Sequence, residues 1–209
     1  MPNSTVFSGV KVTLFGHSSV MLEADGRTFY IDPFILPQGA RPADAIFYTH
    51  GHHDHCAPAP KITSNSTVLV GSSSCRLPVR VIEIGSSEMV GGVRVDAVDA
   101  YNIGKPFHPK GAGAGYIFHF KTARVYVAGD TDAIPEMKRF KCDIAILPIG
   151  GTFTMDASEA ADALAAIMPK VAIPYHYNYL SDTNANPAEF RGMAWQKTGG
   201  KVDVRILLP

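Results

Sequence analysis

Four histidines and one aspartate lie within residues 49–55 of the chain, where they form the pattern H-x-H-x-D-H. Neutral imidazole is the commonest metal ligand in proteins, and a nearby carboxylate lowers the net charge of a bound dication. In an extended segment His50 and His52 face one way, while the adjacent Asp54 and His55 diverge, which suits two neighbouring ions. The alternatives are an exposed histidine-rich loop without a ligand and a mononuclear structural site.

The segment follows the apolar run 45–48, which predicts a buried strand with the histidines in the loop at its C-terminal end. Two further apolar runs, 123–128 and 170–175, end in the same kind of residue, since Asp130 follows the first and His176 follows the second. The C-terminal ends of strands are where open α/β sheets keep their ligands. We therefore expect Asp130 and His176 to join the histidine-rich loop.

In this order of motifs the chain resembles the metallo-β-lactamase superfamily, whose H-x-H-x-D-H loop, later Gly-Asp and final histidine are matched here. The resemblance covers most of the chain, from residues 15–18 through 31–33 to 175–178. Its Gly-His-Ser and Ile-Asp-Pro segments are similar to the branch that contains the ascorbate-6-phosphate lactonases and, more distantly, N-acylphosphatidylethanolamine phospholipase D. The resemblance implies an α+β fold, the four-layer αββα sandwich, with the site at one edge between the two sheets.

The resemblance also implies a function, that of a metal-dependent hydrolase using a metal-bound hydroxide on a small ester, lactone or phosphate ester. The cofactor would be one or two divalent ions, zinc in the first place and manganese or iron as alternatives. Asp54 would also be catalytic, orienting the nucleophile. One ion is assigned to His50 and His52, a second to Asp54, His55 and His176, and the bridging position to Asp130.

One position departs from the family pattern. The family supplies a third histidine to the first metal between the loop and the Gly-Asp, and the matching stretch 99–102 has Asn102 at roughly that place. An amide oxygen is a weaker partner for zinc than imidazole. His108, a few residues later, is either a replacement ligand or a substrate contact. We expect one firmly held ion and a second that is weaker, altered or absent.

Four further residues are candidates for supporting roles. Asp32, at a strand end, could accept a proton from a ligand imidazole and fix its tautomer, or could simply make a turn. His17 either lines the pocket or is a hydrogen-bonded structural histidine. Lys105 and Lys110 lie in a glycine-rich loop and could bind an anionic substrate, unless that loop is only mobile and solvated.

Composition limits the remaining possibilities. A chain of 209 residues with 46% hydrophobic content can bury a good core, so residues 1–209 are expected to form a single domain. With 19 basic and 19 acidic residues there is no broad cationic surface for nucleic acid, so the expected partner is a small molecule. Residues 1–5 lack the features of a signal peptide, and no run approaches the roughly 20 apolar residues of a membrane span. A cytoplasmic location is expected, and the oligomeric state stays open.

The three cysteines, Cys56, Cys75 and Cys142, are odd in number and widely spaced. Neither a disulfide framework nor a zinc ribbon is indicated, and reduced thiols are expected. Cys56 directly follows His55, where it is either a small buried hydrophobic residue or a further metal contact.

Apolar and β-branched runs predict strands at 10–15, 20–24, 28–31, 45–48, 68–70, 79–84, 93–98, 115–120, 124–128, 143–149, 171–174 and 202–207. A helix is predicted from the cap Asp156, with Glu159 completing a capping box, to the residues before Pro169. A second helix is predicted from Pro187 to a stop at residues 199–200.

Two functions of other classes remain open from sequence alone. One is a noncatalytic metal-binding or ligand-sensing protein on the same fold, since Asn102 stands where a ligand is expected. The other is a redox or oxygen-handling protein that uses iron, because histidine and carboxylate suit iron as well as zinc.

Overall fold

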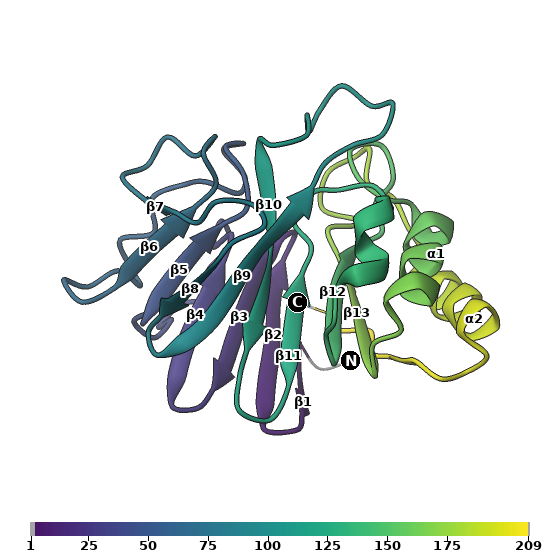
Figure 1. The fold of residues 1–209 in the computed structure, drawn as a ribbon, viewed down its shortest axis with the longest axis horizontal. Helices are drawn as coiled ribbons and strands as arrows, with labels where there is room; N and C mark the ends of the chain where they lie inside the picture. Colours follow the sequence, from purple (N-terminus) through teal and green to yellow (C-terminus); the bar gives the residue numbers. More distant parts are fainter. Residues whose placement is uncertain (1–2, 209) are drawn as a thin grey trace.

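The computed structural model describes residues 3–208, so Met1 and Pro2, part of the segment considered for a signal peptide, lie outside the described residues. Two seven-stranded sheets pack face to face (Figure 1). The first sheet has the order β1 (Ser4–Phe7), β2 (Val10–Gly16), β3 (Ser19–Ala24), β4 (Arg27–Ile31), β5 (Ala45–Tyr48), β6 (Val68–Gly71) and β7 (Arg80–Val81). The second has the order β14 (Asp203–Val204), β13 (Val171–Tyr175), β12 (Ile144–Pro148), β11 (Arg124–Val127), β10 (Gly113–His119), β9 (Val93–Ala100) and β8 (Ser87–Val90).

The two sheets share one pairing pattern. Strands β1 to β4 pair antiparallel and β4 to β7 pair parallel, and in the second sheet β8 to β11 pair antiparallel and β11 to β14 pair parallel. In the β3–β4 hairpin Ala24 pairs with Arg27, and the two turn residues, Asp25 and Gly26, have φ of 53° and 73°. This is the two-residue hairpin turn that the Asp-Gly sequence predicts.

Apolar side chains from both sheets fill the space between them. Strand β5 is buried along its whole length, as expected for a parallel strand covered on both faces. Phe47 of β5 packs edge-on against Phe118 of β10, with ring centroids 4.8 Å apart. This contact crosses from one sheet to the other, so the core holds the two sheets in a fixed relation near the site.

Helices cover the outer face of the second sheet, seen beside β12 and β13 in Figure 1. Helix α1 (Ala157–Ile167) begins at Asp156, whose carboxylate accepts from the Glu159 N–H while the Glu159 side chain accepts from the Asp156 N–H. This confirms the predicted capping box. Helix α2 (Pro187–Thr198) and the short 3-10 helix η1 (Pro135–Arg139) complete this layer.

Loop residues cover the outer face of the first sheet. Ile62, Ala59 and Ala43 are buried there against Ile46 and Tyr48. Among residues 3–208, no helix is long and apolar enough to cross a membrane.

Most predicted elements are present, and the differences lie at the sheet edges. The predicted strands 79–84 and 202–207 shorten to β7 and β14, because an edge strand has only one neighbour to pair with. Strands β1 and β8 and helix η1 were not predicted, since their short sequences carry no clear apolar period.

The expectation of reduced cysteines is wrong at two positions, because Cys56 and Cys75 form a disulfide. Strands β5 and β6 are parallel neighbours, with Ile46 beside Leu69, so the loops that follow them lie side by side. Cys56 is in the first loop and Cys75 in the second, and their Cα atoms are 6.0 Å apart. Cys142 is a buried free cysteine.

Candidate metal centre

The candidate ligands gather at one edge of the sandwich, where strands of both sheets end. His50 follows β5 and Asp130 follows β11, so each comes directly from the end of a parallel strand. His17, Asp32 and His176 follow β2, β4 and β13, and all three have positive φ, of 50°, 45° and 54°. This conformation is costly for residues other than glycine, and such strain clusters at functional sites.

Three imidazoles form the first cluster, with ligand atoms within 4.8 Å of one another: His50, His52 and His108. The Nε2 of His50 lies 2.9 Å from Nδ1 of His52, and the Nε2 of His108 lies 3.3 Å from the same atom. His50 and His108 are buried, whereas His52 is exposed. The structure therefore brings His108 to the two histidines that the sequence assigns to the first ion.

Hydrogen bonds on the far side of two of these rings determine which nitrogens carry lone pairs. The Thr49 hydroxyl donates to Asp32, at 2.6 Å, so its oxygen accepts from Nδ1 of His50, at 3.0 Å. In the same way Nδ1 of His108 donates to the amide oxygen of Asn102, at 3.0 Å. The Nε2 atoms of His50 and His108 are left with lone pairs, and both lie beside Nδ1 of His52, an arrangement that a shared cation stabilises.

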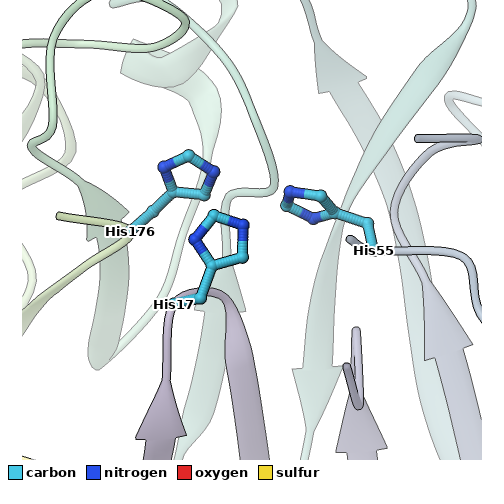
Figure 2. Close-up of side chains that lie close together, drawn as sticks. All are labelled: His17, His55 and His176. Atoms are coloured by element: carbon cyan, nitrogen blue, oxygen red, sulfur yellow. The ribbon is translucent and has the colours of Figure 1, made fainter. Parts of the chain in front are cut away.

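The second cluster contains His17, His55 and His176 (Figure 2), and Asp54 lies beside it. His55 approaches from the first sheet, and its Nε2 lies 3.9 Å from Oδ2 of Asp54. The rings of His17 and His176 have centroids 4.2 Å apart. His17 Nε2 forms a 2.9 Å hydrogen bond to Oδ2 of Asp54, so this histidine holds the carboxylate beside the cluster.

Asp130 lies between the two clusters. Its Oδ2 is 3.3 Å from Nε2 of His108 and 3.2 Å from Nε2 of His176, and its Oδ1 is 3.6 Å from Nε2 of His55. Burial raises the pKa of Asp130, but the surrounding imidazoles, His176 and His55 first, lower it further, to well below its usual range. Asp130 is therefore an anion that faces both groups of ligands.

The same carboxylates act on the histidines. Burial lowers the pKa of His55, but the charges of Asp130 and Asp32 and the hydrogen bond to Asp32 raise it to about 9. Burial, followed by repulsion from His55, lowers the pKa of His50 well below its usual value. The surroundings of His55 thus favour a positive charge. Those of His50 favour the neutral imidazole, which is the form that binds a metal.

Asp32 supports both clusters from behind. It is completely buried, and its Oδ2 accepts from Nδ1 of His55 at 2.8 Å. Its Oδ1 accepts from the Thr49 N–H at 2.8 Å, and its contact with the Thr49 hydroxyl extends to His50. One carboxylate therefore orients a histidine of each cluster, which is the arrangement that commonly fixes the tautomer of metal-binding histidines.

Buried polar atoms without partners test whether these residues fit a cation. Among the described residues, Nε2 of His55, Nε2 of His176 and Oδ1 of Asp130 are buried and have no hydrogen-bond partner. Leaving a buried polar atom unpaired costs about 1–3 kcal/mol. A neutral imidazole nitrogen and a carboxylate oxygen each carry a lone pair. A divalent cation fits this donor set, because it can replace the proton as the positive charge that the surroundings of His55 favour.

Asn102, the other candidate for the first ion, contacts His108 instead. Its amide oxygen accepts from both the backbone N–H and Nδ1 of His108, each at 3.0 Å. Its amide nitrogen donates to Asp132 and to the carbonyl of Phe153. Asn102 therefore positions His108 through the ring nitrogen that faces away from the cluster.

The structure does not bring the two predicted substrate-binding lysines to the clusters. Lys105 Nζ lies 2.8 Å from Asp132 and 2.7 Å from the carbonyl of Thr154. Lys110 Nζ lies 2.7 Å from Glu136, on the exposed surface. Both ammonium groups are paired within the protein, and neither residue lines the pockets beside the histidines. This geometry does not favour an anion-binding role for either.

Comparison with known proteins identifies the family. Residues 11–176 match the model of the β-lactamase superfamily domain. The chain belongs to the metallo-β-lactamase superfamily, as a metal-dependent hydrolase of the UPF0173 family. It is 32% identical to a UPF0173 metal-dependent hydrolase of Methanopyrus kandleri, over 96% of this chain and 97% of that one.

Solved structures of metal-dependent hydrolases confirm the predicted sandwich of the metallo-β-lactamase type, in which loops form the layer over the first sheet of this chain. A protein of Parabacteroides distasonis described as a metal-dependent hydrolase has a TM-score of 0.87 at 31% identity, covering 99% of each chain. The metallo hydrolase Igni18 of Ignicoccus hospitalis has a TM-score of 0.79 at 27% identity, covering 96% of this chain and 95% of that one.

Sequence reasoning missed three residues at or beside this candidate metal centre. Thr49 links Asp32 to His50, and its position directly before His50 was the available signal. The carbonyl of Phe153 contacts Asn102 and His108, and a backbone acceptor leaves no trace in the sequence. Arg76 lines the pocket beside His50, His52 and His108, and nothing in its local sequence indicates this position.

Proposed function

We propose that this chain hydrolyses a small ester, lactone or phosphate ester with divalent cations as cofactors, and that Asp130, which faces both clusters, would help to hold them. His50, His52 and His108 would hold one cation, and Asp54, His55 and His176 the other. The observation that carries the proposal is the convergence of buried, unpartnered ligand atoms of His55, His176 and Asp130 from both sheets. When bound, a divalent cation lowers the pKa of a coordinated water from about 15.7 toward about 7 and polarises the bond under attack.

Asp54 is the residue that we propose as the catalytic carboxylate. Burial raises its pKa, but the hydrogen bond from His17 and the charge of His55 lower it more, so the pKa lies well below the usual value. Asp54 is therefore ionised at neutral pH and can accept a proton from the attacking water. The His17 hydrogen bond holds Oδ2, so the orientation of the carboxylate is fixed before substrate binds.

The first measurement is the number of cations bound per chain. Sequence reasoning predicts one firm and one weak ion, whereas the position of His108 supports two sites of comparable strength. We expect mass-spectrometric metal analysis of chelator-free protein to give two ions per chain, and one in the His108→Ala variant. One ion in both proteins would support the earlier expectation, and none would refute the proposed function.

The bond class is tested with a matched panel of lactones and phosphodiesters. The lactonase resemblance favours acyl chemistry, and the phospholipase resemblance favours phosphodiester cleavage. Asp54→Asn should lower turnover of the accepted substrate by about 100-fold or more, the usual contribution of a general base. Asp182→Asn is the matched control, because that side chain is exposed and lies in a surface loop. Full activity in the Asp54 variant would refute its catalytic role.

A further inference from the structure

Two pockets flank the candidate metal centre and differ in charge. The larger, of about 590 Å³, is lined by His50, His52 and His108 and extends to Arg76 and Leu77. No carboxylate lines it. The smaller, of about 290 Å³, is lined by Asp54, Asp130, Phe153 and Leu180 among others. His52, His53, Phe107 and His108 line both pockets, so a substrate that reaches the clusters can extend into each of them.

Arg76 is a charged group without a counterion in this region. Its side chain is exposed, and within residues 3–208 its guanidinium has no hydrogen-bond or ion-pair partner. Other basic groups in the surrounding loops differ in this respect, since Lys105 and Lys110 pair with Asp132 and Glu136. Arg76 is thus available to bind an anion in the larger pocket.

The fold holds Arg76 at this place. It directly follows Cys75, whose disulfide to Cys56 ties this loop to the histidine-rich loop. A second tie is the Gly51 N–H, which donates to the Ser74 hydroxyl at 2.9 Å. A Cβ on Gly51 would lie 2.2 Å from the Ser74 carbonyl oxygen, so only glycine permits this approach. Two neighbouring contacts, at Ser74 and Cys75, therefore restrain the spacing between Arg76 and the histidine-rich loop.

Apart from its histidines, Ser74 and Arg76, the lining of the larger pocket is apolar. Leu77, Phe107 and Ala112 line it, and the Phe107 ring packs edge-on against Phe153 at 4.8 Å between centroids. A guanidinium beside apolar surface suits an organic anion, because its planar donors match the two oxygens of a carboxylate or phosphate.

We propose that Arg76 binds an oxyanion of the substrate, a carboxylate or phosphate group that is separate from the bond being cleaved. This group would lie in the larger pocket against Leu77 and Phe107, and the uncharged end of the substrate would lie toward Phe153. The proposal rests on the proposed hydrolase function, but the binding of an anion can be measured without turnover. It makes Arg76 a specificity-determining residue rather than a catalytic one.

The test compares two esters of equal chain length, the para-nitrophenyl monoester of glutarate, which is anionic, and para-nitrophenyl pentanoate, which is neutral. Arg76→Gln should raise KM for the glutarate ester about ten-fold, the usual effect of losing a charge-assisted hydrogen bond, and leave kcat within about two-fold. KM for the pentanoate ester should not change. Arg80→Gln is the control, since Arg80 lies in the same segment, pairs with Glu88 and does not line the pocket.

Calorimetric titration of the metal-loaded protein with glutarate, and separately with inorganic phosphate, measures the affinity for each anion independently of catalysis. Whichever anion binds the wild type should bind Arg76→Gln about ten-fold more weakly, which also distinguishes a carboxylate from a phosphate site. If neither ester is cleaved while Arg76→Gln still loses anion binding, the chosen bond class fails and the anion site stands. Equal binding of both anions to the two proteins, or no binding to either, overturns the proposal.

Discussion

Removal of the Cys56–Cys75 disulfide should lower the stability of the fold by about 3 kcal/mol. The two cysteines are 19 residues apart in sequence, so the bond closes a loop of about 20 residues. In the chain-entropy description, a loop of this length costs the unfolded chain about 11 cal/mol/K, or about 3 kcal/mol near room temperature. For a chain of this size, that corresponds to a melting temperature lower by about 6–12 °C.

Thermal unfolding of oxidised wild type and of the Cys56→Ser, Cys75→Ser double variant measures this difference. A phosphine reductant should lower the melting temperature of the wild type to near that of the double variant, and should not affect the variant itself. Cys142→Ser is the matched control, because the third cysteine is buried and unpaired and the variant should keep the response to reductant.

Thiol titration of the unfolded wild type without reductant supplies the decisive count. One reactive thiol, from Cys142, is expected if the bond is present. Three reactive thiols, or a melting temperature that reduction leaves unchanged, would refute the stabilising role that we assign to the bond.

Three further predictions concern the site and its surroundings. Asn102→Ala should weaken binding of one metal ion by about 10–100-fold, because His108 loses the acceptor that fixes its ring. Equal retention of both ions after dialysis would contradict this. Chelator treatment should lower the melting temperature and added metal should restore it, since removal of the ions leaves buried ligand atoms unpaired. An unchanged melting curve would show that the ions do not stabilise the fold. Burial raises the pKa of Asp143, but the hydrogen bonds from the Arg124 N–H and from Lys170 outweigh burial, so the pKa in the folded protein is lowered. The stabilisation from the ionised carboxylate is therefore present above about pH 4 and is lost as the pH falls through the pKa of the folded state. Asp143→Asn should therefore destabilise the protein at pH 7 more than at pH 2 in denaturant titrations, and an equal difference at both would refute this assignment.

The strands that carry the site could be predicted from sequence because they are buried on both faces. Strand β5 matches its prediction residue for residue, and β11 and β13 differ by one residue at the C-terminal end. Their apolar residues run up to within two residues of the ligands, so the strand end and the ligand are one signal. Edge strands such as β7 lack this contrast, since one side faces solvent and pairing alone decides their length.

The choice between Asn102 and His108 could not be made from sequence, because it depends on a loop that folds back on itself. The Asn102 N–H donates to the His108 carbonyl at 2.8 Å, and the Asn102 amide oxygen accepts from the His108 N–H. These two mutual hydrogen bonds place the His108 imidazole in the first cluster and the Asn102 amide on the side of that ring away from the cluster. Local spacing shows only that both residues are near, whereas their order from the centre outward is set by these hydrogen bonds.

The pairing of Lys105 and Lys110 shows a second limit of sequence reasoning. Their loop is rich in glycine and basic residues, but each ammonium group has a carboxylate partner from a distant segment, Asp132 or Glu136. Composition reports the charge of a loop and not whether that charge is already paired. Arg76 was overlooked for the converse reason, since its free guanidinium becomes apparent only when the loops after β5 and β6 lie together.

The site also contributes to holding the two sheets together. His50, Asp54 and His55 come from the first sheet, whereas Asp130 and His176 come from the second. The same edge is bridged by backbone, because the His176 N–H donates to the His17 carbonyl at 3.0 Å and the Ala114 N–H donates to the Thr49 carbonyl at 2.9 Å. A cation shared by ligands from both sheets would add its binding free energy to their packing, since the unfolded chain does not preserve such a set. Metal affinity and sheet packing would thus be coupled, so a variant that loses either should weaken the other.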